Sequence, residues 1–411
     1  MRTPPSLPSL LLLLFALVAP AGAQDPVEYL LEGRDRQRGS FQGRLELTPG
    51  TDGPLVRRRA VFRDAVETLE ARGRKQDTEL RVEFPAGPGI AGAVGGAGAG
   101  APLRLRVLFD EAEAELEGTL RRGNQQVARE EGYRVRGLTP PGAAAGASLE
   151  ALRPAPDSAG HAYQRFVGVP FVRGEGDAHE VDMNDVSQGS LGDCYFMAGL
   201  ASVARTNPER VKAMIDDHGD GTFSVYAWHH NDQWEEPQVG PDGTYDFVRT
   251  AVRIRVDDAF PASGSGPAYA EFGDRETVEG VTRHELWPML FEKAYAQVKG
   301  SYTAIEGGAA STSMSFFAHG EVTDHETSEN TVAQLRTLLE RAQREGRAVT
   351  LGVPTSNSAL GIYGNHYYAF WGLDAEGRVL LYNPWGSSHP PRGLTLEEVK
   401  QYIDSIHVGP R

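Results

Sequence analysis

The chain has 411 residues and a formal net charge of −15 at neutral pH. This acidic balance argues against nucleic acid and anionic membrane surfaces as partners, because both carry negative charge themselves. At roughly 100–200 residues per domain, the length predicts two or three domains.

The amino terminus has the features of a secretory signal peptide. Arg2 precedes an apolar run over residues 10–18, and Ala21, Gly22 and Ala23 form a small-residue cleavage sequence. An uncleaved membrane anchor is the alternative, but the run is shorter than the roughly 20 residues that span a bilayer. We therefore expect residues 1–23 to be removed and the mature protein to be secreted, extracellular or periplasmic, with no membrane attachment.

Residues 24–136 are expected to form a small β-rich domain. Apolar and polar residues alternate over 43–47, 78–84 and 103–107, which is the period of strands with one buried face. Residues 86–102 are almost entirely glycine and alanine, and we expect a mobile loop there. No residue pattern gives this domain a chemistry, so substrate binding, surface attachment and covering of an active site all stay open as roles.

Residues 137–160 are expected to be a Gly/Ala/Pro-rich linker, and residues 161–411 a second domain of mixed helix and strand. Apolar periodicity and capping residues predict helices over 194–204, 285–298 and 331–345, and one that begins near Thr395. Strand-like runs are expected at 223–228, 252–256, 348–353, 367–373 and 379–382. The predicted fold class is α+β, with a helical half followed by a β-rich half.

Cys194 is the only cysteine in the chain, so a secreted product has no intrachain disulfide partner for it. At the start of a predicted helix, the helix dipole and unpaired N–H groups would lower the pKa of the thiol and favour the nucleophilic thiolate. Gly189 and Gly192 would permit a tight turn into the helix, and Asp193 would cap it. A buried structural cysteine is the alternative reading.

His366 is the candidate base among eleven histidines. It enters a predicted strand ahead of a hairpin turn centred near Glu376, ten residues later, and Asn383 follows that turn by seven residues. The two side chains therefore lie at the same end of the hairpin, with an offset of three residues or about 10 Å along a strand. A bulge, or a bend at Pro384, must close this gap if Asn383 is to orient the imidazole. The alternative is a histidine without a catalytic role, whose ring nitrogens form ordinary hydrogen bonds at the end of a strand.

Acyl transfer also needs donors for the oxyanion that develops on the substrate. Gln188 lies six residues before Cys194, and its side-chain amide together with the main-chain N–H of Cys194 would supply two donors. Trp385 would shield the hydrogen bond between His366 and Asn383 from water. A solvated turn glutamine and a tryptophan in ordinary core packing are the bland alternatives.

Together these residues resemble the calpain family of papain-like cysteine proteases. The family's nucleophile motif matches Gln188-Gly189-Ser190-Leu191-Gly192-Asp193-Cys194, and its asparagine motif matches Asn383-Pro384-Trp385-Gly386. Residues 286–296, Leu-Trp-Pro-Met-Leu-Phe-Glu-Lys-Ala-Tyr-Ala, resemble a helix of the same family. The resemblance runs from about residue 166 to the carboxyl terminus. It implies a two-lobed papain-like domain with Cys194 as nucleophile, His366 as base, Asn383 as orienter and Gln188 in the oxyanion hole.

Two departures from the family pattern leave the reacting groups intact. Tyr195 replaces the tryptophan that usually follows the cysteine, and Asn365 stands between the glycine and His366. Animal members of the family bind two calcium ions in the protease core, and here only Asp185 and Glu292 match ligands of the first site. Residues 387–389 lack the acidic ligands of the second, so no metal ligand and no required cofactor are assigned, although calcium stays open.

A calcium loop of the EF-hand type is not expected. Residues 216–221 read Asp-Asp-His-Gly-Asp-Gly, but Ala227 stands where the bidentate glutamate of such a loop would be. We expect a turn between strands there instead.

The resulting hypothesis is a secreted cysteine endopeptidase that hydrolyses peptide bonds of protein or peptide substrates through a thioester. An acyl transferase of the transglutaminase type and an inactive binding scaffold are the alternatives. Cleavage preference and oligomeric state do not follow from the sequence.

Overall fold

The computed structural model describes residues 26–62, 65–85, 101–110, 115–138, 147–156, 160–175, 177–230, 238–239, 245–246, 249–386 and 391–410. The expected signal peptide, most of the Gly/Ala-rich loop, part of the linker and residues 387–389 lie outside these ranges. Within the described residues, no helix is both long and apolar enough to cross a membrane.

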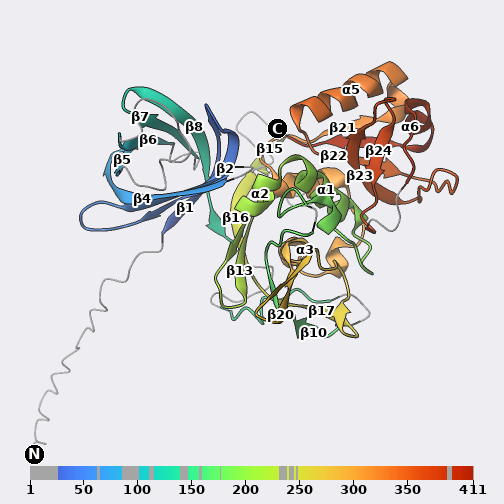
Figure 1. Ribbon diagram of the computed structural model, residues 1–411, viewed down its shortest axis with the longest axis horizontal. Helices are drawn as coiled ribbons and strands as arrows, with labels where there is room; N and C mark the ends of the chain where they lie inside the picture. Colours follow the sequence, from blue (N-terminus) through green and yellow to red (C-terminus); the bar gives the residue numbers. More distant parts are fainter. Residues whose placement is uncertain are drawn as a thin grey trace, which may run out of the picture.

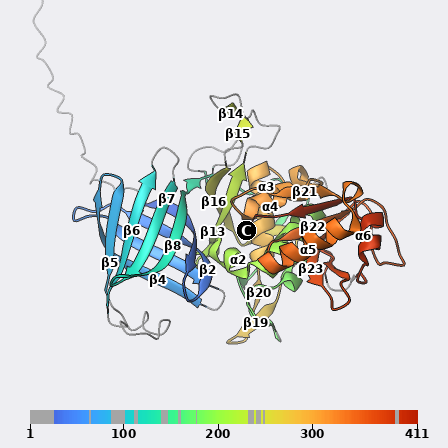
Figure 2. The same ribbon diagram turned by 90° about the horizontal axis from the view of Figure 1, so that it is seen from above.

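The amino-terminal part of the chain forms a closed barrel of eight antiparallel strands (Figures 1 and 2). Each strand pairs with the next, and the first pairs with the eighth, which leaves no open edge. The strands are β1 (Val27–Asp35), β2 (Gly39–Thr48), β3 (Leu55–Phe62), β4 (Ala65–Gln76), β5 (Glu79–Phe84), β6 (Leu103–Asp110), β7 (Glu115–Arg122) and β8 (Gln125–Arg134). The alternating segments of the sequence lie in β2, β5 and β6.

Apolar side chains fill most of the barrel, but one ion pair is buried in it. Arg58 donates from Nε and Nη2 to one Glu130 oxygen, at 2.8 and 2.7 Å, and both side chains are almost fully inaccessible to solvent. Glu67 accepts a further bond from Arg58 at 3.2 Å and one from Arg38 at 3.0 Å. A guanidinium and a carboxylate removed from water depend on each other, because either one alone would be an uncompensated charge.

The barrel docks on the part of the chain that contains α2 (Pro208–Ala213), β13 (Thr222–His230) and β16 (Arg249–Asp257) (Figure 1). Tyr133 packs edge-on against Trp228, with ring centroids 5.0 Å apart. Three ion pairs cross this interface: Arg44–Asp216, Arg210–Glu32 and Arg253–Glu28. Asp216 belongs to β12 (Ile215–Asp217), and residues 218–221 connect β12 to β13, as predicted for a turn between strands.

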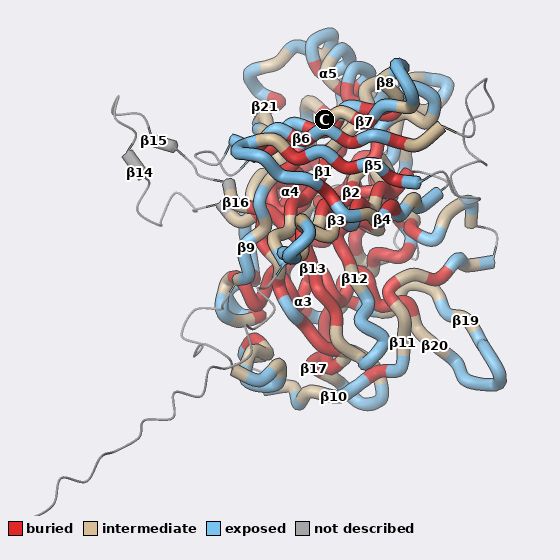
Figure 3. The backbone as a smooth tube through the Cα atoms, turned by 90° about the vertical axis from the view of Figure 1, so that its left-hand side faces the viewer, coloured by how far each residue is buried: buried red, intermediate tan, exposed pale blue. Residues whose placement is uncertain are grey.

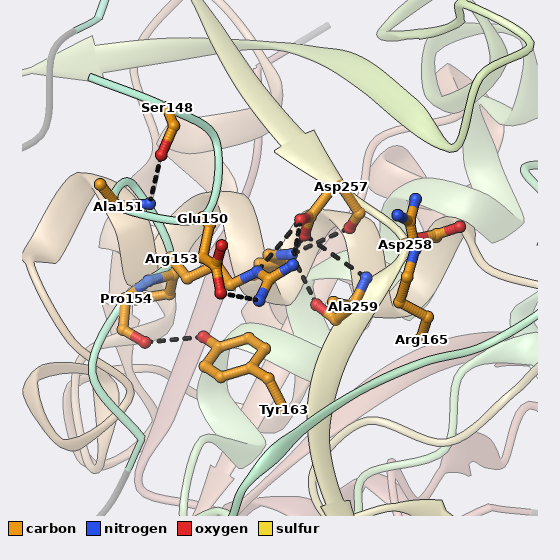
Figure 4. A network of polar contacts seen from close by, with 11 residues as sticks. Ser148, Glu150, Ala151, Arg153, Pro154, Tyr163, Arg165, Asp257, Asp258 and Ala259 are labelled. Atoms are coloured by element: carbon orange, nitrogen blue, oxygen red, sulfur yellow. Dashed lines mark hydrogen bonds and ion pairs between the residues drawn. The ribbon is translucent and has the colours of Figure 1, made fainter.

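The segment expected to be a free linker is attached to the second half of the chain. The two-residue strand β9 (Arg136–Gly137) pairs in parallel with β16. Further along, Arg153 donates to Asp257 Oδ2 at 2.7 and 3.0 Å, and Lys293 binds the other oxygen of the same carboxylate (Figure 4). Composition predicted a linker here because it does not show that a single arginine, Arg153, pairs with the buried Asp257 and attaches this segment to the rest of the chain.

The next part of the chain is built around two helices that carry the predicted motifs. α1 (Cys194–Thr206) confirms the first predicted helix, and α3 (Trp287–Lys299) confirms the second, although it begins two residues later than expected. α3 is buried on all sides from Trp287 to Val298, and Figure 3 shows it within the buried interior. The smaller helix α4 (Ala310–Phe317) packs against α1 and β13.

Several short strands surround this helical core. They are β10 (Tyr163–Arg165), β11 (Gly168–Val169), β14 (Gln238–Val239), β15 (Tyr245–Asp246), β17 (Ala259–Ser263), β18 (Gly266–Pro267), β19 (Arg275–Val278) and β20 (Val281–Glu285). The β19–β20 hairpin projects from the body and is largely exposed (Figure 3).

The carboxy-terminal part is a five-stranded antiparallel sheet in the order β21-β25-β22-β23-β24. Its strands are β21 (Thr323–Glu326), β22 (Val349–Val353), β23 (His366–Leu373), β24 (Val379–Tyr382) and β25 (Ser405–Val408). The helices are α5 (Val332–Glu345) and α6 (Leu396–Tyr402), and the capping box predicted at Thr395 is present at the start of α6. A second capping box, which was not predicted from the sequence, is formed by Thr331 and Gln334 at the start of α5. These two helices share a hydrophobic core with the sheet, while α1 packs against β22 and β23.

The buried ion pair of the barrel generates a stability prediction. Glu130→Ala leaves the Arg58 charge without its main partner, so we expect it to lower the free energy of unfolding by about 3–5 kcal/mol. The matched control is Glu70→Ala, which removes the exposed Arg57–Glu70 pair and should cost less than about 1 kcal/mol. Urea denaturation of the full chain, with hydrogen exchange reporting on β3 and β8, measures both. Equal losses in the two variants would contradict the prediction.

Candidate active site

Cys194 is the first residue of α1, and the turn that precedes it packs tightly against the rest of the chain. A Cβ at Gly189 would lie 2.0 Å from the carbonyl oxygen of Tyr269, so glycine is needed there for space. Neither Gly189 nor Gly192 has a positive φ, and a Cβ at Gly192 would meet nothing within 4 Å. The expectation that both glycines supply conformational freedom was therefore wrong, and close packing explains only the first.

The environment of the thiol is more apolar than the sequence suggested. Burial raises the pKa of Cys194 above its ordinary value, and the adjacent Asp193 acts in the same direction. The main-chain N–H groups of Tyr367, Tyr195 and Cys194 itself act in the opposite direction, as hydrogen-bond donors to the sulfur. The N–H groups at the start of α1 thus lower the pKa of the thiol as expected, but burial raises it by more.

His366 and Asn383 are brought into direct contact. The imidazole Nε2 donates to Asn383 Oδ1 over 2.8 Å, which leaves Nδ1 free for a different partner. Both side chains are buried, at 4% and 1% exposure. Burial lowers the pKa of His366, and the hydrogen bond to Asn383 partly opposes this shift.

A β-bulge produces this contact. At the turn end of the hairpin Leu373 pairs with Val379, but the register shifts between Phe370 and Gly372, so that Ala369 pairs with Tyr382. Continuing that register by one residue places Asn383 opposite Tyr368. Because residues two apart in a strand share a face, Asn383 then lies on the face of His366. The expected gap of three residues is shortened to two.

The imidazole sits between aromatic rings. Trp385 lies with its ring centroid 4.4 Å from that of His366, and Tyr368 meets the imidazole edge-on at 5.0 Å. Asn365, which precedes the histidine, has a left-handed φ of 51°. Asparagine tolerates that conformation better than most residues with a side chain, which explains how it can stand where the family has glycine.

The sulfur and the imidazole approach each other through the main chain of β23. The N–H that donates to the sulfur belongs to Tyr367, the residue directly after His366. Among the contacts described for this chain, no hydrogen bond joins the thiol to the imidazole ring. The Cys194 thiol, the His366 imidazole and the Asn383 amide therefore all lie near the start of β23.

Gln188 lies close to these residues, and its side-chain amide already donates a hydrogen bond within its own turn. Its Nε2 donates to the carbonyl oxygen of Leu191, and its own main-chain N–H donates to Pro384 at 2.7 Å. The second hydrogen on Nε2 remains for another acceptor. The bond to Pro384 also ties the turn before the nucleophile to the segment that carries Asn383.

A polar cleft of roughly 700 Å³ opens next to these groups. Its lining includes Gln188, together with Trp385, whose ring also contacts His366. The other lining residues are Asn184, Ser187, Gly189, Ser190, Pro267, Ala268, Glu271 and Gly386. No described barrel residue lines the cleft, so the arrangement gives no support to a covering role for the barrel.

Asp185 and Glu292, the two residues that match ligands of the family's first calcium site, have different partners. One oxygen each from Asp177, Asp185 and Asp274 lie within 4.8 Å of one another. Glu292 belongs elsewhere: it accepts a hydrogen bond from the Ala270 N–H at 3.0 Å and bonds to Asp193. Glu292 is buried and therefore is no surface charge, and it is not part of the carboxylate group around Asp185.

The residues around Asp185 fit a divalent cation that prefers oxygen ligands. Burial raises the pKa of Asp185 to about 8, and burial with the nearby Asp185 charge raises that of Glu285 to about 9. Glu285 also accepts hydrogen bonds from the N–H groups of Val172 and Asp274. No ion pair within the described residues neutralises the Asp177, Asp185 and Asp274 carboxylates, which is the charge pattern that calcium would compensate.

Sequence reasoning missed three residues of this region. Glu285 was taken as the first residue of a helix, although it ends β20, and Glu271 gave no signal at all. Tyr367 contributes only its main chain, which residue identity does not reveal. The carboxylate of Glu292 among the apolar positions of α3 was a usable signal for its hydrogen-bond donor, because buried charges need partners.

The chain was compared with known proteins. The profile of calpain family cysteine proteases matches residues 176–390, which include all four predicted site residues. Calpain-9 of Rattus norvegicus is 27% identical over 247 residues, covering 53% of this chain and 32% of that protein. Calpain of Schistosoma mansoni is 25% identical over 232 residues, and the calpain-type cysteine protease DEK1 of Arabidopsis thaliana is 28% identical over 250 residues. These alignments cover 28% and 10% of the respective relatives.

The matched region thus spans about a third or less of each relative, and it begins after the barrel. The calpain protease domain is papain-like, in agreement with the mixed α and β structure of this part of the chain. The profile covers more than half of the 411 residues. The chain belongs to the calpain family of cysteine proteases.

Proposed function

We propose that this chain is a secreted, two-lobed cysteine endopeptidase that hydrolyses protein or peptide substrates through a thioester. The observation that carries the proposal is the 2.8 Å bond from His366 Nε2 to Asn383 at the start of β23, the strand against which α1 with Cys194 packs. The two lobes would be the helical core around α1 and the sheet that contains β23.

In this mechanism His366 Nδ1 accepts the proton of Cys194, and the sulfur attacks the substrate carbonyl carbon. The developing oxyanion would receive hydrogen bonds from the Cys194 N–H and the second N–H of Gln188 Nε2. The imidazolium then returns its proton to the leaving amine as the C–N bond breaks. Water, deprotonated by the same imidazole, hydrolyses the thioester and restores the thiol.

Asn383 acts in this scheme by orientation. Its Oδ1 accepts the Nε2 proton and also the main-chain N–H of Trp385 at 3.1 Å, so two donors fix the position of one oxygen. This bond selects the tautomer in which Nδ1 is the basic atom. Because the ring is buried and its pKa lowered, the imidazole stays neutral below its ordinary titration range until it takes the thiol proton.

Substitution of the triad tests the proposed hydrolase. Cys194→Ala should abolish peptide hydrolysis, and Asn383→Ala should lower kcat/KM on the order of a hundredfold, or about 2.7 kcal/mol. Asn124→Ala, in the turn between β7 and β8, is the matched control and should change nothing. Thermal unfolding verifies that each variant folds. Full peptidase activity in the Cys194 variant would end the assignment.

The cleft suggests which substrates fit. Glu271 is the sole charged residue among its described lining residues, and its Oε2 accepts a hydrogen bond from Ser187 Oγ at 2.9 Å. The remaining lining residues are uncharged: polar or small residues, together with Pro267 and the aromatic Trp385. A peptide side chain with a positive charge would therefore be bound better than an acidic one.

A peptide library should show this preference. Glu271→Gln is expected to reduce the kcat/KM ratio of lysine or arginine substrates over acidic ones about tenfold, which corresponds to about 1.4 kcal/mol. Glu276→Gln, on the exposed hairpin away from the cleft, serves as the control. An unchanged ratio in the Glu271 variant would show that this carboxylate does not select the substrate.

Calcium is the cofactor that the carboxylates around Asp185 would hold. Asp177, Asp185 and Asp274 would supply oxygen ligands, and the ion would compensate their mutual repulsion and stabilise the loops that carry them. These loops border the cleft, because Asn184 and Ser187, close to Asp185 in the sequence, and Glu271, close to Asp274, are among its lining residues.

Calorimetry with calcium on the full chain tests this site. Asp185→Asn should weaken binding at least tenfold and reduce the calcium-induced rise in Tm, since it removes the most buried of the three carboxylates. Asp324→Asn, whose carboxylate pairs with His407 on the distant sheet, is the control. Identical isotherms for the wild-type chain and the Asp185 variant would exclude these ligands.

A further inference from the structure

Two hydrogen bonds join the turn before the nucleophile to the end of β24. The Tyr382 hydroxyl donates to the main-chain carbonyl of Val186 at 2.7 Å, and the Gln188 N–H donates to the Pro384 carbonyl at 2.7 Å. Both partners advance by two residues from one bond to the next, so the two segments run side by side in the same direction. Val186 belongs to the helical core and Tyr382 comes from the sheet, so these bonds join the two parts of the protease domain.

Tyr382 is a residue of the sheet whose side chain reaches into the other core. On β24, the side chains of Val379 and Leu381 belong to the core of the sheet, whereas Tyr382 belongs to the core around α1 and α3. Successive residues of a strand point to opposite faces, which explains the difference. Burial raises the pKa of Tyr382, and the charges of Asp185 and Asp182 act in the same direction, so the phenol keeps the proton that it donates.

The two segments also approach each other closely one residue beyond these bonds. Gly386 has a left-handed φ of 92°, and a Cβ there would lie 3.2 Å from Ser187 Oγ. Among the described hydrogen bonds between residues 186–191 and 382–386, the bond of Tyr382 is the one that a side chain donates. Substitution of Tyr382 can therefore remove one link between the segments and leave their main-chain bond in place.

Each of the two joined segments carries part of the candidate site. Asn383 follows Tyr382 directly in the chain and accepts the hydrogen bond from His366. Gln188 lies two residues after Val186 and is the proposed side-chain donor to the oxyanion. The Tyr382 bond thus lies between the residue that orients the base and the residue that would bind the oxyanion. A misplacement of about 1 Å between such groups can cost on the order of a hundredfold in rate.

We infer that Tyr382 is a positioning residue, whose hydroxyl fixes the place of Gln188 relative to Asn383 and the imidazole. The inference rests on the proposed function, in which the Gln188 amide donates to the oxyanion. Tyr382 acts through the turn that contains Val186 and Gln188. Because the oxyanion exists only after attack on the substrate, loss of the Tyr382 hydroxyl should lower kcat and leave KM nearly unchanged.

The test is Tyr382→Phe in the full chain, which removes the hydroxyl and keeps the ring in the core. We expect kcat to fall on the order of tenfold and KM to stay within about twofold of the wild-type value. Gln188→Ala should lower kcat on the order of a hundredfold. Adding Tyr382→Phe to Gln188→Ala should lower kcat by less than about twofold more, because the positioned donor is already absent. Multiplied effects in the double variant, or full kcat in Tyr382→Phe, would overturn the inference.

Tyr163→Phe is the matched control. It removes a bond of the same kind, from the Tyr163 hydroxyl to the Pro154 carbonyl at 2.6 Å (Figure 4), and neither residue is among those that line the cleft. Thermal unfolding should show a lower Tm for both variants, whereas kcat should fall only in Tyr382→Phe. An equal loss of kcat in the two variants would mean that stability and not position is responsible, and the inference would fail.

Hydrogen exchange provides a measurement that does not depend on catalysis. Exchange over residues 186–191 should accelerate on the order of tenfold in Tyr382→Phe and stay unchanged in Tyr163→Phe. If the wild-type chain cleaves no peptide but this acceleration is seen, the proposed function fails while the contact of Tyr382 with the turn stands. If the wild-type chain cleaves peptides and exchange over residues 186–191 is the same in Tyr382→Phe, the inference fails while the proposed function stands.

Discussion

The packing of α1 against β23 is the constraint on which the site depends. α1 belongs to the core built with α3 and α4, whereas β23 belongs to the sheet covered by α5 and α6. Cys194 comes from the first element and His366 with Asn383 from the second, so the reacting groups meet only where these two bodies touch. At that point the main-chain N–H of Tyr367, the residue after His366, acts to lower the pKa of the Cys194 thiol. The distance between the thiol and the imidazole is therefore set by the packing between the two hydrophobic cores.

Helices and strands with strong local signals were predictable from the sequence. The capping box at Thr395, the end of α5 at Gly346 and the hairpin before Val379 depend on neighbours within a few residues, and each appears where it was expected. The start of α3 was misplaced because Glu285 is held at the end of β20 by the N–H groups of Val172 and Asp274. Those partners are far away in the sequence, and local propensity carries no information about them.

The residues of the candidate site could also be predicted from local sequence, whereas their exact arrangement could not. Residue types and spacing identified the thiol, the imidazole and the amide, and the need for a bulge followed from counting residues around the turn. The position of the bulge, between Phe370 and Gly372, was not predictable, since it depends on how β23 and β24 pack against the helices. The partner of Glu292 was not predictable for a related reason: a buried carboxylate signals that a partner exists, but not which one.

The acidic residues around Asp185 place a separate demand on the same domain. Asp177, Asp185 and Asp274 come from separate segments of the chain, and one oxygen of each lies within 4.8 Å of the others. No ion pair among the described residues neutralises these carboxylates, an arrangement that oxygen-binding cations stabilise. Asn184 and Ser187, close to Asp185 in the sequence, line the cleft. An ion that fixed the position of Asp185 would therefore also fix part of the cleft lining.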